Sequence, residues 1–181
     1  MIIDIGKIKR EMVFPILLQS VSSGILTSTL FSKITPIMDS SSLIIIERIL
    51  GIGYKISYGT LNEVFIKVSL FVVIQFIALS FLFQISAQIL CKFDISFLDV
   101  AFIVSKPLII SAIILICGLP WLLVTPLAAL PFLLASFIVT LVYNHTVICS
   151  TFNLNINKGV FLTTSVYLIY FTFIFICIIK T

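Results

Sequence analysis

Few residues of this chain belong to the types that carry catalysis or bind metals. There is one histidine, His145, and the four cysteines at positions 91, 117, 149 and 177 form no C-x-x-C pair. Metal sites need several such ligands close together. The chain has no HExxH, Walker A, G-x-S-x-G or G-x-G-x-x-G motif, and no serine has a recognisable base. The sequence therefore predicts no catalytic residue, no cofactor-binding residue and no metal ligand.

The acidic residues are confined to the flanks of the apolar segments. All seven lie outside the expected centres of membrane spans: Asp4, Glu11, Asp39, Glu47, Glu63, Asp94 and Asp99. An ionisable side chain at mid-membrane would indicate a proton or ion pathway, because its insertion costs about 2.5–3.5 kcal/mol. This distribution counts against a proton-coupled transporter. His145 is expected near the end of a span, where a structural, hydrogen-bonded role is favoured over a functional one.

Small and polar side chains recur at intervals of four residues in three apolar segments, and therefore share one helix face in each. They are Ser20, Gly24 and Ser28 in one segment, Ser80, Gln84 and Gln88 in another, and Ser136, Thr140 and Asn144 in a third. Small residues let helices approach closely, and amides form hydrogen bonds between helices. We interpret these stripes as packing faces within a bundle. The alternatives are a polar substrate path and a docking face for another membrane subunit. Gln84 and Gln88 should face protein, because an amide in lipid is costly.

The composition places these faces in an integral membrane protein. Of the 181 residues, 61% are apolar and 10% are charged, and the mean hydropathy is +1.31. Soluble domains carry about 45–50% apolar and about 25% charged residues, and a chain of this size has one modest core in which to hide the excess. Intrinsic disorder and a secreted disulfide scaffold are excluded. The net charge of +4 forms no basic cluster, so the expected partners are the lipid bilayer and other membrane subunits, and no nucleic acid.

Five apolar segments are long enough to cross a membrane. A helix needs roughly 20 apolar residues to cross about 30 Å of hydrocarbon, and the runs are continuous rather than alternating, which predicts helices and not a barrel. Pro120, Pro126 and Pro131 divide the charge-free run 107–157, because proline breaks helices. The expected fold is an all-α integral membrane protein, a single membrane domain with spans at about 12–31, 68–91, 100–119, 127–147 and 160–179.

Two of these spans have alternative interpretations. The third could begin at Pro107, a favoured first helical residue, but we prefer a start near Val100, from which Lys106 can snorkel to the headgroups. The first could be a signal peptide cleaved near residues 20–22. Its apolar run continues to Phe31, so we prefer an uncleaved span.

The basic residues predict the orientation. Lys7, Lys9 and Arg10 precede the first span, and the flank of the first helix usually dominates the positive-inside rule. We therefore expect a cytoplasmic N-terminus and, with five spans, an external C-terminus. The long first loop, 32–67, is then external. Within it, three serines at 40–42 precede the mostly apolar segment 43–50, which predicts a short amphipathic helix lying on the membrane or on the bundle. A gate or a partner-docking helix is the alternative.

A diffuse pattern of small, polar and apolar positions covers residues 65 to 181. It includes the segments 84–92, 95–100, 142–144 and 153–158, together with Pro107, Pro120 and Tyr167. This pattern resembles the Yip-domain family (Ypt-interacting proteins), in particular its bacterial branch. The resemblance implies five spans, a cytoplasmic N-terminus, an amphipathic Ser96-Phe97 start of the third helix, and a non-enzymatic role beside transporters or envelope-stress systems. The acidic DLxGP motif of the eukaryotic members is missing, so binding to Rab-type GTPases is not carried over.

Together these observations favour a non-catalytic polytopic protein of a bacterial plasma membrane. We expect an accessory or scaffold subunit that associates with other membrane proteins, such as a transporter complex. A small channel or permease for ions or small solutes is the alternative. The polar stripes and the helix-breaking prolines favour it, whereas the lack of an internal repeat disfavours it. An intramembrane enzyme is least favoured, because the sequence offers no paired catalytic residues.

Overall fold

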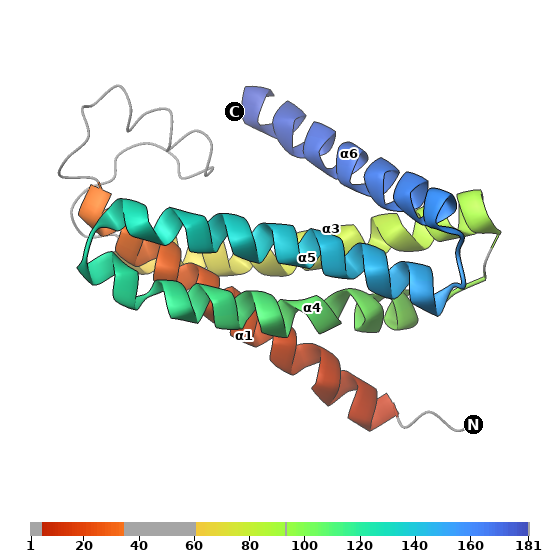
Figure 1. Cartoon of the computed structure of the whole chain (residues 1–181), viewed down its shortest axis with the longest axis horizontal. Helices are drawn as coiled ribbons and strands as arrows, with labels where there is room; N and C mark the ends of the chain where they lie inside the picture. Colours follow the sequence, from red (N-terminus) through yellow and green to blue (C-terminus); the bar gives the residue numbers. More distant parts are fainter. Residues whose placement is uncertain (1–4, 35–60, 93, 181) are drawn as a thin grey trace.

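A computed structural model describes residues 5–34, 61–92 and 94–180 of the chain (Figure 1). Helix accounts for 92% of these described residues, and none of them lies in a strand. The helices are α1 (Ile5–Ile34), α3 (Leu61–Cys91), α4 (Phe97–Gly118), α5 (Leu130–Thr151) and α6 (Ile156–Lys180), with the 3-10 helices η1 (Pro120–Leu123) and η2 (Pro126–Ala129) between α4 and α5. Five of the described helical segments are long and apolar enough to cross a membrane. The expected all-α fold with five such segments is therefore confirmed for the described residues. The amphipathic helix expected at 43–50 lies outside the described residues.

Each α-helix extends past the span expected from the sequence on at least one side. The fourth span, which we expected at 127–147, is shifted toward the C-terminus. Its first residues belong to η2, and α5 begins only at Leu130 and ends at Thr151. Pro131 lies in the first turn of α5, the position where a proline fits a helix without losing a hydrogen bond.

Ser96 determines the start of α4. Its side-chain oxygen accepts a hydrogen bond from the Asp99 backbone N–H at 3.2 Å, and its hydroxyl donates to the Asp99 carboxylate at 2.6 Å. A serine at this N-cap position satisfies a backbone donor that has no partner within the helix. Because α4 begins at Phe97, Pro107 lies inside it, and the alternative start at Pro107 is wrong.

Lys106 points toward the nearer end of α4. Its side chain is exposed, and its Nζ lies 5.0 Å from the centroid of the Phe102 ring. Phe102 is about one helical turn closer to the start of α4. A cation above an aromatic ring is attracted to it, and this is the direction that a lysine takes when it reaches from apolar surroundings toward water.

Two short helices carry the chain from α4 into α5. Pro120 begins η1 and Pro126 begins η2, and both prolines occupy the first turn of their helix. Lys33, near the end of α1, donates a hydrogen bond from its Nζ to the Leu122 carbonyl oxygen at 2.7 Å. The prolines therefore lie in the turn between the third and fourth segments, and the end of α1 is tied to that turn.

Helix α4 lies at the centre of the bundle. It packs against α1, α3 and α5, and half of its 22 residues are buried. By contrast, three of the 22 residues of α5 are buried. Helix α6 packs against α3 and α5 near its start and then diverges from the bundle toward the C-terminus (Figure 1). The larger core cluster joins α3, α4 and α6 around Phe83 and Tyr167, whose rings meet edge to face with centroids 6.0 Å apart.

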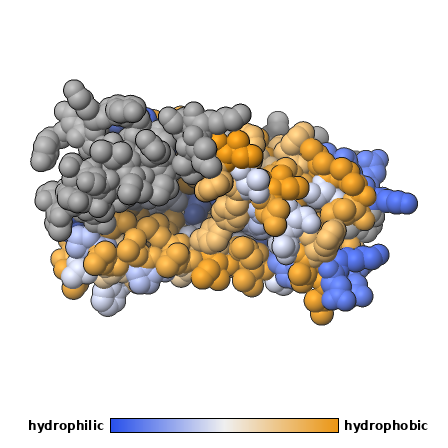
Figure 2. Space-filling model, turned by 90° about the horizontal axis from the view of Figure 1, so that it is seen from above, coloured by the Kyte–Doolittle hydropathy of each residue, from blue (hydrophilic) through white to orange (hydrophobic). Residues whose placement is uncertain are grey.

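Apolar side chains cover the length of the molecule, whereas hydrophilic ones gather at one end (Figure 2). The start of α1, the α3–α4 connection and the α5–α6 connection lie at the same end of the bundle, and the α4–α5 turn lies at the opposite end (Figure 1). Lys92 and Asp94 are exposed in the α3–α4 connection, and Lys158 is exposed in the first turn of α6. An apolar belt that adjoins a hydrophilic end is typical of a bundle that crosses a membrane.

Candidate functional site

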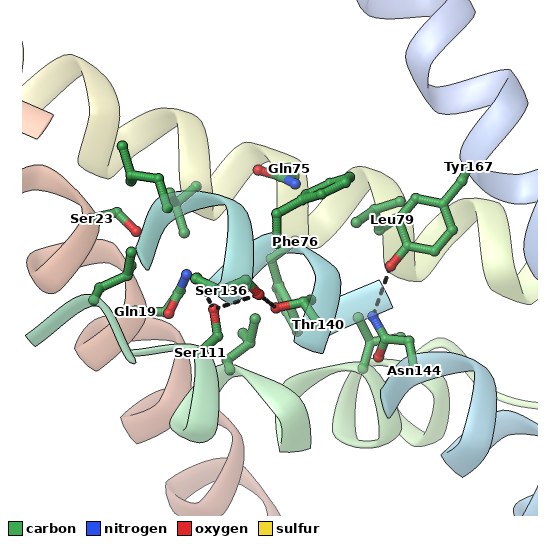
Figure 3. Close-up of a pocket in the computed structure, with 16 residues that line it drawn as sticks. Gln19, Ser23, Gln75, Phe76, Leu79, Ser111, Ser136, Thr140, Asn144 and Tyr167 are labelled. Carbon is green, nitrogen blue, oxygen red and sulfur yellow. Dashed lines mark hydrogen bonds between the residues drawn. The ribbon is translucent and has the colours of Figure 1, made fainter. Parts of the chain in front are cut away.

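Polar side chains from several helices converge on one cavity. The cavity has a volume of about 140 Å³, and all five long helices contribute to its wall (Figure 3). The polar members of that wall are Gln19, Ser23, Gln75, Ser111, Ser136, Thr140, Asn144 and Tyr167. None of the described residues that line it is Asp, Glu, Lys, Arg or His, so the cavity is polar without being charged.

The cavity has a buried floor and an opening at one side. Every lining residue of α1 and α4 is buried, so these two helices form the floor. The lining residues that are partly or fully exposed all belong to α3 or α5: Val72, Gln75, Leu133, Phe137 and Thr140. The opening therefore lies between α3 and α5, along the side of the bundle rather than at its ends.

Ser111 and Ser136 join α4 to α5 across the floor. Their hydroxyls form a short hydrogen bond, and the Ser111 hydroxyl also lies 3.3 Å from the Ser136 carbonyl oxygen. Thr140 donates to that same carbonyl oxygen at 2.8 Å. Ser111 and Ser136 are buried. These bonds satisfy hydroxyls that burial would otherwise leave without a partner, and they hold the two helices together.

Asn144 joins α5 to α6 at one end of the cavity. Its side chain is fully buried, and its Nδ2 donates a hydrogen bond to the Tyr167 hydroxyl at 3.0 Å (Figure 3). The other amide atom, Oδ1, is buried and has no hydrogen-bond partner among the described residues. A buried acceptor without a partner costs about 1–3 kcal/mol, so native structures rarely keep one.

Gln19 presents a second acceptor of this kind at the other end of the cavity. It lies midway along α1, and its side chain is 8% exposed. Its Oε1 is buried and also has no hydrogen-bond partner in the described part of the chain. Gln19 and Asn144 lie on opposite sides of the Ser111–Ser136 pair (Figure 3). The cavity therefore has an unpaired amide oxygen at each end and paired hydroxyls between them.

The first polar stripe lies at the contact of α1 with α3. The Ser20 hydroxyl donates to the Ser69 carbonyl oxygen at 2.8 Å, and the Ser69 hydroxyl donates to the Ser20 carbonyl oxygen at 3.1 Å. Gly24 faces Phe65 and Ser69 so closely that an added Cβ would overlap both. Ser28 is buried, and its hydroxyl donates within its own helix to Ile25.

The second and third stripes have different surroundings. Ser80 is buried and donates to the Phe76 carbonyl oxygen in its own helix, and Gln84 donates to the Ile95 carbonyl oxygen at 3.2 Å. Gln88 is exposed, so the expectation that it faces protein within this bundle is wrong. It lies in the last turn of α3, where an amide can reach water. All three residues of the third stripe, Ser136, Thr140 and Asn144, line the cavity.

Sequence reasoning did not single out Gln19, Ser111 or Tyr167 as site residues. Gln19 immediately precedes the first stripe and so lies on the neighbouring face of α1. An amide in the middle of an apolar segment is itself unusual, and that fact could have identified Gln19. Ser111 belongs to no four-residue repeat, and Tyr167 entered only through the family resemblance. These side chains reach the cavity because of how each helix is rotated about its own axis. The spacing of residues along the sequence does not specify that rotation.

His145 contacts two side chains of types that can act as nucleophiles, Cys149 and Thr163. The Cys149 Sγ lies 3.7 Å from both ring nitrogens of His145, so it is aligned with neither of them. The His145 Nδ1 lies 3.2 Å from the Thr163 hydroxyl of α6. Gly159 leaves room for this contact, because a Cβ there would overlap Cys149. These contacts link α5 to α6, and the Cys149 thiol is not aligned with either ring nitrogen of His145.

No cluster of three or more His, Cys, Asp or Glu side chains that could hold a metal ion occurs among the described residues. Comparison with known proteins adds no relative: no family model, curated protein or solved structure matches this chain. The resemblance to the Yip-domain family therefore stays a hypothesis based on the sequence pattern alone.

Proposed function

We propose that this chain is an integral protein of the cell membrane that crosses the bilayer five times, with a cytoplasmic N-terminus and an external C-terminus. Its apolar surface supports insertion. On α3 alone, the exposed side chains include Ile66, Leu70, Phe71, Ile74, Ile77 and Phe81. Water would penalise such a surface, whereas lipid tails solvate it without cost.

We further propose that the protein has no catalytic activity of its own and acts as an accessory or scaffold subunit for other membrane proteins, such as a transporter complex. One observation carries this proposal: two pairs of polar side chains within the apolar segments hold helices together. Ser20 bonds to Ser69 between α1 and α3, and Ser111 bonds to Ser136 between α4 and α5. Such contacts give structural specificity rather than chemistry.

The outer face of α5 is the surface that we assign to a partner subunit. Helix α5 belongs to the least buried of the five candidate spans. Of the 18-residue stretch that represents each span, 11% is buried for α5, compared with 56% for α4. Tyr143 and Thr146 are exposed on this helix among apolar neighbours. A tyrosine with its apolar body and polar tip is well suited to a contact between membrane helices.

Photo-crosslinking in native membranes tests the scaffold proposal. A photoreactive amino acid at Ile138 of α5, which is 56% exposed, should give a defined adduct with one other membrane protein. The same residue at Ile113 of α4, which is 51% exposed, is the matched control and should give lipid adducts. Lipid adducts at both positions, together with a monomeric purified protein that turns over a substrate, would contradict the proposal.

The cavity favours a second candidate function, a small permease for uncharged solutes. Its polar groups lie between the helices, and its opening lies on the side of the bundle between α3 and α5. Liposomes that contain the protein should then take up labelled glycerol faster than protein-free liposomes. Val72→Trp, which places an indole at the opening, should abolish the difference. Equal uptake with and without the protein would eliminate this candidate.

A further inference from the structure

The two unpaired amide oxygens point to a missing hydrogen-bond donor. Gln19 Oε1 and Asn144 Oδ1 are buried and have no partner among the described residues, and both belong to residues that line the same cavity. Both atoms accept hydrogen bonds and cannot donate them. An occupant that satisfies them must therefore carry an O–H or N–H group. The Ser111–Ser136 pair between them is already bonded to itself and does not need a donor.

The wall of the cavity selects against a charged occupant. Its described lining residues include no acidic or basic side chain, and their apolar members include Phe76, Leu79 and Leu108. A charge placed there would lose its hydration without gaining a counter-charge, which is prohibitively costly. The two amide oxygens lie at opposite ends of the cavity, so they do not surround one point as the ligands of a metal cation would (Figure 3).

The position and size of the cavity limit the occupant further. Gln19 and Gln75 each lie near the middle of their helices, so the cavity is near the middle of the bundle's length. Given the proposed membrane insertion, its side opening between α3 and α5 faces hydrocarbon rather than water. A volume of about 140 Å³ is close to that of an engineered cavity that holds benzene.

We propose that this cavity is a binding site for a small, uncharged, membrane-soluble molecule that has an apolar body and at least one hydroxyl or amide N–H group. The molecule enters laterally between α3 and α5. Gln19 Oε1 or Asn144 Oδ1 accepts its hydrogen bond, and the apolar wall contacts its body. The proposal rests on the membrane insertion proposed above and is independent of any partner subunit.

A pair of fluorinated probes tests the requirement for a donor. 4-Fluorophenol and 4-fluorotoluene have similar shapes, and only the first can donate a hydrogen bond. Both are titrated by fluorine NMR into lipid nanodiscs with and without the protein. One net hydrogen bond corresponds to a roughly 3- to 10-fold change in affinity. We expect saturable, protein-dependent binding of 4-fluorophenol that is tighter than that of 4-fluorotoluene by about this factor.

Four variants assign the binding to the cavity. Gln19→Leu removes one acceptor that has no bond to lose, so the protein should fold normally and its preference for 4-fluorophenol should shrink. Val72→Trp should abolish binding of both probes. Ile74→Trp, on the exposed face of α3 two residues away, is the matched control and should bind as the unsubstituted protein does. Asn144→Leu gives a second test of the acceptors, with folding checked by thermal unfolding.

Several outcomes would overturn the proposal. Equal affinity for the two probes would identify a plain apolar void, and no saturable binding would leave water as the occupant. Binding that survives Val72→Trp would place the probes elsewhere. Incorporation into nanodiscs is scored first. A protein that does not incorporate contradicts both the membrane assignment and the site, whereas an incorporated protein without donor preference contradicts the site alone.

Discussion

Gly24→Leu is expected to lower the free energy of unfolding by about 3 kcal/mol, the upper end of the usual cost of overpacking. Gly24 faces Phe65 and Ser69 of α3, where the two helices lie close together. A Cβ added there would overlap the Ser69 hydroxyl and lie 2.7 Å from the Phe65 ring. Leucine must therefore push α1 away from α3. The paired Ser20–Ser69 hydrogen bonds would then break, because they need the same close approach.

Chemical unfolding in mixed micelles, followed by circular dichroism, measures this effect. Ile25→Leu is the matched control: Ile25 follows Gly24 directly, is 40% exposed, and should change the unfolding free energy by less than about 0.5 kcal/mol. Gly24→Ala should fall between the two variants. If Gly24→Leu unfolds like Ile25→Leu, then α1 does not pack on α3 in the way described here.

Much of the fold could be predicted from the sequence, because hydrocarbon thickness and proline chemistry are local constraints. The number of long apolar helices follows from segment length, and Pro120 and Pro126 lie in the turn between α4 and α5. Helix ends were less predictable. Ser96 caps α4 through a hydrogen bond to Asp99, and this bond, rather than hydropathy, determines where the helix begins.

The candidate site could be predicted only in part. Ser136, Thr140 and Asn144 share a face at intervals of four residues, and that face does line the cavity. Gln19 and Ser111 reach the cavity because α1 and α4 are rotated toward α5, which depends on contacts between helices that are distant in sequence. Gln88, by contrast, was expected to face protein and does not do so within this bundle. Its spacing matched a stripe, but its position in the last turn of α3 leaves it exposed.

Thiol labelling tests the proposal that the chain crosses the membrane five times with a cytoplasmic N-terminus. The native cysteines at positions 91, 117, 149 and 177 are first replaced. Single cysteines are then introduced as Asp94→Cys and Asn155→Cys at one end of the bundle, and as Val124→Cys in the α4–α5 turn at the other end (Figure 1). All three positions are exposed, so a thiol at each can ionise and react.

A membrane-impermeant maleimide added to intact cells should label Val124→Cys and leave Asp94→Cys and Asn155→Cys unlabelled. Inverted vesicles should give the opposite pattern. In the proposed topology, α4 and α5 each carry the chain across the bilayer between these positions, and the basic flank at Lys7, Lys9 and Arg10 holds its end of the bundle inside. A fully reversed pattern would contradict the orientation, and labelling of Asp94→Cys and Val124→Cys from the same side would contradict the five crossings themselves.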